Sequence, residues 1–250
     1  MDFTLKIYKQ LLSSFQQAGY MFLTFQQFCE NRAEEKFIIL RHDVDLKAEN
    51  SFATAQIEHQ SGIKASYYFR IVPQSDKPQI IKEIAALGHE IGYHYEDLSL
   101  FNGDVEKAIE HFKTKLEYFR QYYPVKTICM HGSPTSKIDN KDIWKTYNYR
   151  DFDIMGEPYF DVDFNKVFYL TDTGRCWDGE KYSIRDKVQS SFTQKFHTTD
   201  QIIEALKTNS LPHQIMIITH PQRRTNNFAE WLTEYIWQSV KNQIKSRLSV

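Results

Sequence analysis

The sequence has few cysteines, no long apolar run and no excess of charge of one sign. Its three cysteines, Cys29, Cys129 and Cys176, lie far apart and form no C-x-x-C pair. This spacing argues against both a disulfide framework and a zinc ribbon. A reducing compartment is the simpler inference for such a chain.

No stretch approaches the 18 consecutive apolar residues that indicate a transmembrane helix. Residues 1–6 begin with an acid and do not lead into the apolar segment of a secretory signal. We therefore expect a cytoplasmic protein without a transmembrane segment. The 31 basic and 32 acidic residues give a formal net charge of −1, so no electrostatic attraction to nucleic acid is evident. An uncharged or mildly polar substrate fits this balance better.

What the chain does contain is enough apolar sequence for one large core. It has 250 residues, of which 41% are hydrophobic and 15% aromatic, a length normal for a single α/β barrel. Neither an internal repeat nor a linker is evident, so residues 1–250 are expected to form one domain. Strand-like and helix-like segments alternate as in parallel βαβ units. The predicted strands are 37–40, 65–69, 89–96, 127–131, 167–171 and 215–220, and the main predicted helices are 5–18, 48–59, 80–87, 104–122 and 228–248.

The chain is organised around the strand at 37–40, whose four apolar residues indicate burial on both faces. It is followed by Arg41, Asp43 and Asp45. Because side chains alternate along a strand, Asp43 and Asp45 are expected on one side at its carboxyl end, where α/β proteins place their chemistry. Two neighbouring carboxylates repel each other and need a cation, a shared proton or nearby imidazoles. A single Asp here would suit a helix cap, whereas the pair favours a functional site.

Three further predicted strands end in histidines, namely His94, His131 and His220. In a barrel of parallel strands these ends meet at one mouth. Any one of these histidines alone is more often structural, but three beside two aspartates predict a divalent-metal site, with zinc the first choice. Arg41 is expected on the same face as Asp43 and in contact with it.

These residues, in this order, resemble the polysaccharide deacetylase family, also called the NodB-homology fold or carbohydrate esterase family 4. The segment 40–45 stands where the family has T-F-D-D-G. Residues 88–94, Gly-His-Glu-Ile-Gly-Tyr-His, match its G-H-E-[IV]-[GA]-x-H run, and a late strand ends in Ile-Thr-His at 218–220.

A finer resemblance is carried by the segment Arg41-His42-Asp43-Val44-Asp45 together with residues 169–175 and Trp177. These residues resemble the divergent WbmS-like deacetylases, which are associated with bacterial surface-polysaccharide gene clusters.

The resemblance implies a distorted (β/α) barrel, a divalent metal and removal of N- or O-acetyl groups from carbohydrates. Carried over by position, Asp43 matches the catalytic base, His94 the first metal histidine and His220 the late catalytic histidine. Asp43 would then take a proton from the attacking water, and His220 would protonate the leaving group.

The sequence departs from the family at two places. Leu98 stands where the family has its second metal histidine, and Val44 separates two aspartates that are usually adjacent. We expect Asp45 to act as the metal aspartate and His131 to replace the missing histidine. Glu96, on the same strand face as His94, is the alternative third ligand.

Arg175, Trp177 and Arg41 are the candidate substrate-binding residues. Arg175 would orient Asp43 or bind an anionic substrate group, and the alternative is an ion pair with Asp172 or Asp178. Trp177 would stack on a sugar face, and the alternative is core packing. Arg223 and Arg224 follow the last strand and are expected in a solvated turn, and the alternative is that they meet a phosphate or a carboxylate.

The first functional hypothesis is a metal-dependent carbohydrate deacetylase. Its substrate would be a nucleotide-linked sugar, a lipid-linked sugar or another small N-acetylated precursor of a surface polysaccharide. The second hypothesis is a degenerate barrel that binds sugar without turnover, and its main support is Leu98. The third is hydrolysis of a non-sugar amide or cyclic amidine, because the same groups would serve any such C–N bond. The oligomeric state is left open.

Overall fold

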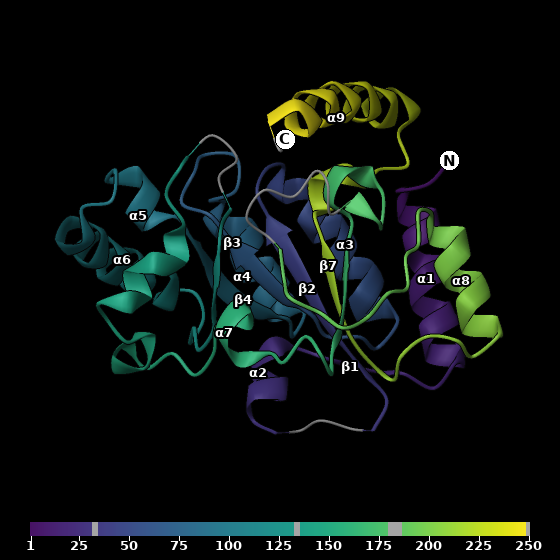
Figure 1. The fold of residues 1–250 in the computed structure, drawn as a ribbon, viewed down its shortest axis with the longest axis horizontal. Coiled ribbons are helices and arrows are strands. Elements are labelled where there is room, and N and C mark those ends of the chain that lie inside the picture. Colours follow the sequence, from purple (N-terminus) through teal and green to yellow (C-terminus); the bar gives the residue numbers. More distant parts are fainter. Residues whose placement is uncertain (32–34, 133–135, 180–186, 249–250) are drawn as a thin grey trace.

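The computed structural model describes residues 1–31, 35–132, 136–179 and 187–248 (Figure 1). In this part of the chain seven strands form one sheet, and all of their pairings are parallel. The strand order is β5-β4-β3-β2-β7-β6, and β1 pairs with the first half of β2. The strands are β1 (Met21–Leu23), β2 (Phe37–Val44), β3 (Ser66–Phe69), β4 (Glu90–Tyr95), β5 (Ile128–Met130), β6 (Phe168–Thr171) and β7 (Gln214–Thr219).

The sheet curls into a barrel that is not closed. Its edge strands are β5 and β6, and no pairing between them occurs within the described ranges. The protein is therefore an α/β protein with a distorted (β/α) barrel, which confirms the fold class predicted from the sequence. The other predicted strands end within about two residues of the observed ends, whereas β2 continues four residues beyond the predicted apolar run, to Val44.

Long helices cover the outside of the curled sheet and shorter ones fill the loops. The helices are α1 (Leu5–Gln17), α2 (Phe25–Cys29), α3 (Ala48–Gln60), α4 (Pro78–Ala86), α5 (Asp97–Leu100), α6 (Val105–Arg120), α7 (Pro158–Asp161), α8 (Thr199–Lys207) and α9 (Phe228–Leu248), with 3₁₀ turns η1 (Asn140–Lys145), η2 (Tyr149–Phe152), η3 (Thr173–Arg175) and η5 (Pro221–Arg223). The sequence analysis missed α8. Its start carries a readable signal, because Thr198 and Gln201 form a reciprocal capping box.

Strand alternation divides the apolar residues of β2 between two cores. Ile38 and Leu40 belong to the large core beneath the outer helices, whereas Phe37 and Ile39 belong to a smaller core inside the curl. All eight residues of β2 are buried. Arg41 and Asp43 continue the inner row by the same alternation, so the strand carries its charged residues toward the interior of the barrel.

Gly92 allows β3 and β4 to pack closely on the inner face. It pairs in register with Tyr68, and a Cβ atom at residue 92 would lie 2.3 Å from Cε1 of that ring. The Tyr68 hydroxyl thereby reaches Thr127 Oγ1 at 2.8 Å. A side chain at position 92 would displace this ring and with it the strand that ends in His94.

The helix α9 crosses above the carboxyl ends of the central strands (Figure 1). For the region 147–177 the sequence predicts irregular loops and one strand. The structure forms that strand as β6 and adds the short helical segments η2, α7 and η3. No helix in the ranges described above combines the length and apolar character that a membrane crossing needs.

Glu157 is a fully buried carboxyl that joins α7 to the end of β5. Its side chain accepts hydrogen bonds from the backbone N–H groups of Met130, at 3.0 Å, and Tyr159, at 2.6 Å. Burial raises its pKa from 4.5 to about 7, against the opposing effect of these donors.

This raised pKa predicts a pH-dependent stability. Below pH 4.5 the carboxyl is protonated in both the folded and unfolded states, and between 4.5 and about 7 only the unfolded state releases the proton. The free energy of unfolding should therefore fall by about 3 kcal/mol across that window. The Glu157→Gln variant should lack this fall when both proteins are unfolded with urea between pH 4.5 and 7.5. Parallel pH curves for variant and wild type would contradict the prediction.

Candidate metal centre and active site

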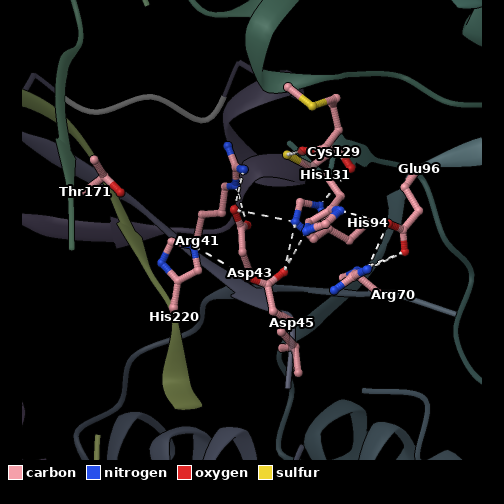
Figure 2. Close-up of polar contacts among 12 residues, drawn as sticks. Arg41, Asp43, Asp45, Arg70, His94, Glu96, Cys129, His131, Thr171 and His220 are labelled. Carbon is pink, nitrogen blue, oxygen red and sulfur yellow. Dashed lines mark hydrogen bonds and ion pairs between the residues drawn. The ribbon is translucent and has the colours of Figure 1, made fainter. Parts of the chain in front are cut away.

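The five residues predicted as catalytic or metal-binding meet at the carboxyl ends of the strands. Asp43 lies near the end of β2 and Asp45 just beyond it, His94 lies on β4, and His131 and His220 directly follow β5 and β7. Figure 2 shows the three imidazoles pointing toward the two carboxylates. Three different strand ends thus supply the histidines, as the parallel topology requires.

Asp43 is held by Arg41 on the same strand. The guanidinium donates to both carboxylate oxygens, from Nε to Oδ1 at 2.7 Å and from Nη2 to Oδ2 at 2.6 Å. Burial raises the pKa of Asp43, but the charge of Arg41 outweighs burial and the pKa lies below its ordinary value. Asp43 is therefore ionised at neutral pH. Arg41 itself is 0% exposed, which corrects its predicted role in contacting substrate: it acts on Asp43.

Asp45 presents a buried oxygen with no hydrogen-bond partner. Its Oδ1 lies 3.7 Å from Nε2 of His94 and 3.6 Å from Nε2 of His131. Two atoms that bind one ion at about 2.1 Å each can lie up to about 4.2 Å apart. Each imidazole is therefore close enough to Asp45 Oδ1 to share an ion with it, and an unpaired carboxylate oxygen between two imidazoles is otherwise costly to bury.

The other ring nitrogen of each imidazole is already engaged. Nδ1 of His94 lies 2.9 Å from the Cys129 carbonyl, and Nδ1 of His131 lies 2.9 Å from Glu96 Oε2. A carbonyl and a carboxylate only accept, so Nδ1 carries a proton in both rings, and in the neutral form of each ring Nε2 presents its lone pair to Asp45. Partners of this kind orient the histidine ligands of metals.

Glu96, the alternative third ligand, lies behind His131 instead of at the centre. Arg70 donates to both of its oxygens at 2.8 Å. Burial raises the pKa of Glu96, but His131 and Arg70 outweigh burial and lower it to about 2. Leu98, at the place of the missing histidine, is 4% exposed and packs into the main core. The arrangement favours His131 over Glu96 as the third ligand.

A rival trio consists of Asp43, His94 and Cys129, whose ligand-type atoms all lie within 4.8 Å of one another. Both oxygens of Asp43 are occupied by Arg41, and the Cys129 thiol contacts the Met130 carbonyl at 3.6 Å. A metal ion there would stand next to the buried positive charge of Arg41. In the set of Asp45, His94 and His131 the carboxylate oxygen has no hydrogen-bond partner, so no bond to Arg41 has to break for it to bind an ion.

His220 is held by a buried carboxylate that the sequence analysis did not assign to the site. Its Nδ1 lies 2.6 Å from Asp172 Oδ1, and its Nε2 lies 3.9 Å from Asp45 Oδ2. Because a carboxylate only accepts, Nδ1 carries the proton and Nε2 faces the centre. The position of Asp172 directly after the predicted strand 167–171 was the available signal, since strand ends carry the chemistry of this fold class.

Arg223 and Arg224, expected in a solvated turn, are buried instead. Arg223 Nη1 contacts Asp172 Oδ1 at 2.6 Å, and Arg224 Nη1 contacts Oδ2 at 2.7 Å. Burial raises the pKa of Asp172, but the two guanidiniums and His220 outweigh it and hold the pKa well below the ordinary value. The turn is therefore part of the site.

The predicted roles of Trp177 and Arg175 are wrong. Trp177 is 4% exposed and its indole N–H donates to Thr199 Oγ1 at 3.0 Å, so it is a packing residue. Arg175 lies beneath α9, where its guanidinium faces the Trp231 ring at 5.0 Å and donates to the Arg223 carbonyl at 3.2 Å. Neither side chain lines the cavity at the strand ends.

That cavity has a volume of about 560 Å³. The five site residues and Arg70 line one side, and residues of α9 line the other. A second group of ligand-type side chains, Cys176, Asp178 and His197, lies away from this cavity and nearer the surface, with His197 Nδ1 2.8 Å from Asp178 Oδ1. Any measurement of metal content must distinguish the two groups.

No protein-family model matches this sequence, and no curated protein matches it either. Among solved structures, the chain is similar to a family 4 carbohydrate esterase pseudoenzyme from Bacillus anthracis, with 13% identity, a TM-score of 0.46 and coverage of 83% of this chain and 62% of that one. This chain therefore spans less than two thirds of that structure. It is also similar to PdaA of Bacillus subtilis, a family 4 carbohydrate esterase, with 14% identity, a TM-score of 0.42 and coverage of 94% of this chain and 84% of that one. A further similar structure is a family 4 carbohydrate esterase of Streptomyces lividans in complex with acetate, with 11% identity, a TM-score of 0.43 and coverage of 86% of this chain and 91% of that one. Identities this low and TM-scores below 0.5 do not indicate a function, so the function proposed below rests on the geometry of the site.

Proposed function

We propose that the protein is a metal-dependent hydrolase that removes an acetyl group from a carbohydrate. The observation that carries this proposal is the unpaired Asp45 oxygen between His94 and His131, beside an ionised Asp43. Asp45, His94 and His131 would hold the ion, and two nitrogens with one oxygen suit zinc. When bound, a divalent ion polarises a carbonyl and lowers the pKa of a water molecule.

In this proposal the two remaining side chains exchange protons. Asp43, kept ionised by Arg41, accepts a proton from the attacking water as general base. His220 donates a proton from Nε2 to the departing nitrogen or oxygen, while Asp172 holds its Nδ1 proton and fixes the ring. Asp43 and His220 are thus the catalytic residues, and Arg41 and Asp172 are positioning residues.

The two alternatives are weighed by particular residues. A degenerate, sugar-binding barrel was supported mainly by Leu98. His131, whose Nε2 lies 3.6 Å from Asp45 Oδ1, would replace the missing ligand, and this supports turnover. Hydrolysis of a non-sugar amide or amidine would use the same five residues. Only a comparison of substrates separates that alternative from deacetylation.

The finer assignments also belong to this proposal. We infer from the segment 41–45 and residues 169–175 that the chain belongs to the WbmS-like branch. A small N-acetylated precursor of a surface polysaccharide is the preferred substrate class, because α9 lies above the strand ends and limits the cavity to about 560 Å³. The cytoplasmic location stays a prediction.

Acetate release tests the proposal. The purified protein, loaded with one zinc ion per chain, is incubated with N-acetylglucosamine, its 1-phosphate and UDP-N-acetylglucosamine, and acetate is measured enzymatically. We expect release from at least one of them, loss of release with a chelator and recovery on adding zinc. No release from any N-acetylated or O-acetylated sugar by the fully loaded protein would contradict the deacetylase assignment.

A further inference from the structure

The helix α9 turns its apolar face outward and its polar face inward, which is the reverse of an ordinary surface helix. Its outward residues are apolar and exposed: Phe228, Leu232, Ile236, Val240 and Ile244 are between 38% and 60% exposed. Its polar residues Glu234, Gln238 and Lys241 line the cavity at the strand ends. A surface helix usually buries its apolar side and exposes its polar one. Burial of apolar surface therefore does not explain why this polar face is turned inward.

The inward face of α9 completes a polar cavity whose opposite wall is the candidate active site. A volume of about 560 Å³ falls within the range of pockets that hold ligands larger than a single sugar ring. Trp237 also lines this cavity and is 57% exposed. An exposed indole in a polar cavity offers a flat surface for stacking.

The positively charged side chains that line the cavity differ in whether they form an ion pair with a carboxylate. Arg70 and Arg223 line it but are bound to Glu96 and Asp172. Lys47 and Lys241 also line it, and neither has an ion-pair partner within the described ranges. Lys241 Nζ lies over the Trp237 ring, 5.3 Å from its centre, so the charge and the indole stand together in the cavity wall.

We propose that α9 forms a second subsite, in which Lys241, Lys47 and Trp237 bind a phosphate-bearing unit of the substrate beyond the acetylated sugar. The inference rests on the proposed function and narrows its substrate class to sugars linked to phosphate. The two lysines contact the phosphate oxygens, and Trp237 stacks on a ring attached to them. Glu234, the carboxylate on the same wall, accepts hydrogen bonds from hydroxyl groups of that unit.

The test compares substrates that differ only in this unit. KM and kcat are measured for N-acetylglucosamine, its 1-phosphate and UDP-N-acetylglucosamine, with wild type, Lys241→Gln, Lys47→Gln and Trp237→Ala. We expect each lysine variant to raise KM about tenfold for the two phosphate-bearing substrates, at least five times more than for the uncharged sugar. Trp237→Ala should raise KM for the nucleotide-linked sugar more than for the 1-phosphate. Val240→Ala, on the outward face of the same helix, is the control and should leave KM unchanged for both the phosphate-bearing and the uncharged substrates.

Equal changes in KM for the charged and uncharged sugars, or none for either lysine variant, would overturn the subsite. If wild type hydrolyses none of the three, that result bears on the proposed function and not on the subsite. The subsite is then decided by calorimetric titration with UDP-N-acetylglucosamine. Binding that weakens about tenfold in Lys241→Gln but not in Val240→Ala supports it, and absence of binding to wild type overturns it.

Discussion

Replacing Asp43 with asparagine is expected to lower the rate of acetate release by about a thousandfold while metal content stays at the wild-type level. An amide cannot accept the proton of the attacking water, and general-base catalysis is worth about 10²–10⁴-fold. The bound metal should remain because Asp43 is engaged by Arg41 and is not in the proposed ligand set. Activity is measured as acetate release, and metal by elemental analysis of the same sample.

The same substitution should also lower stability. Arg41 is 0% exposed, and asparagine would leave its charge uncompensated, at a cost of about 3–5 kcal/mol. The double variant Arg41→Gln, Asp43→Asn removes that charge and is the matched control: part of the thermal stability should return, but the activity should not. Activity above a tenth of wild type in folded Asp43→Asn, or loss of its metal, would show that Asp43 is not the base.

The second large effect is expected at Asp172. Its carboxylate is 0% exposed and meets two guanidiniums and one imidazole. In Asp172→Asn, two buried arginines lose their counter-charge, at a cost of about 3–5 kcal/mol. For a chain of this size we expect the midpoint of thermal unfolding to fall by roughly 10 °C. Activity should fall as well, because His220 loses the group that fixes its tautomer.

The pH dependence of this effect has a definite sign. Since the folded-state pKa of Asp172 is depressed below its ordinary 3.8, its contribution to stability is complete at pH values well above 3.8 and decreases as the pH falls below it. The stability difference between wild type and Asp172→Asn should therefore be constant from pH 5 to 8 and shrink in acid. Asp178→Asn, at a carboxylate 33% exposed, is the control and should shift the midpoint by no more than about 2 °C. A midpoint in Asp172→Asn equal to that of this control would refute the buried network.

Much of the framework was predictable because the signals are local. The apolar run of β2 and the alternation after it placed Asp43 on the inner face, and the rule that parallel strands share one carboxyl edge brought His94, His131 and His220 together. The same alternation turns His42 to the opposite face, where its Nε2 contacts Glu58 Oε1 at 2.7 Å. The roles assigned to these residues stay predictions.

What the sequence did not reveal depends on packing between distant segments. Arg223 reads as a solvated turn residue until Asp172, 51 positions earlier, is placed beside it. The sequence allows Trp177 to be a stacking surface or a packing residue. Its hydrogen bond to Thr199, a residue 22 positions later, holds it in the packed position. The inward polar face of α9 leaves no distinctive local pattern, because helical periodicity gives the faces of a helix but not the direction in which each face points.

The most direct test of the proposed metal site is the metal content of purified wild type, His131→Ala and Cys129→Ala. Cys176→Ser is included to exclude a contribution from the second group, Cys176, Asp178 and His197. We expect about one zinc ion per chain in wild type, Cys129→Ala and Cys176→Ser, and little in His131→Ala. Wild type that acquires no metal on incubation with zinc, iron, cobalt or nickel would contradict it. So would metal that persists in His131→Ala and is lost in Cys129→Ala.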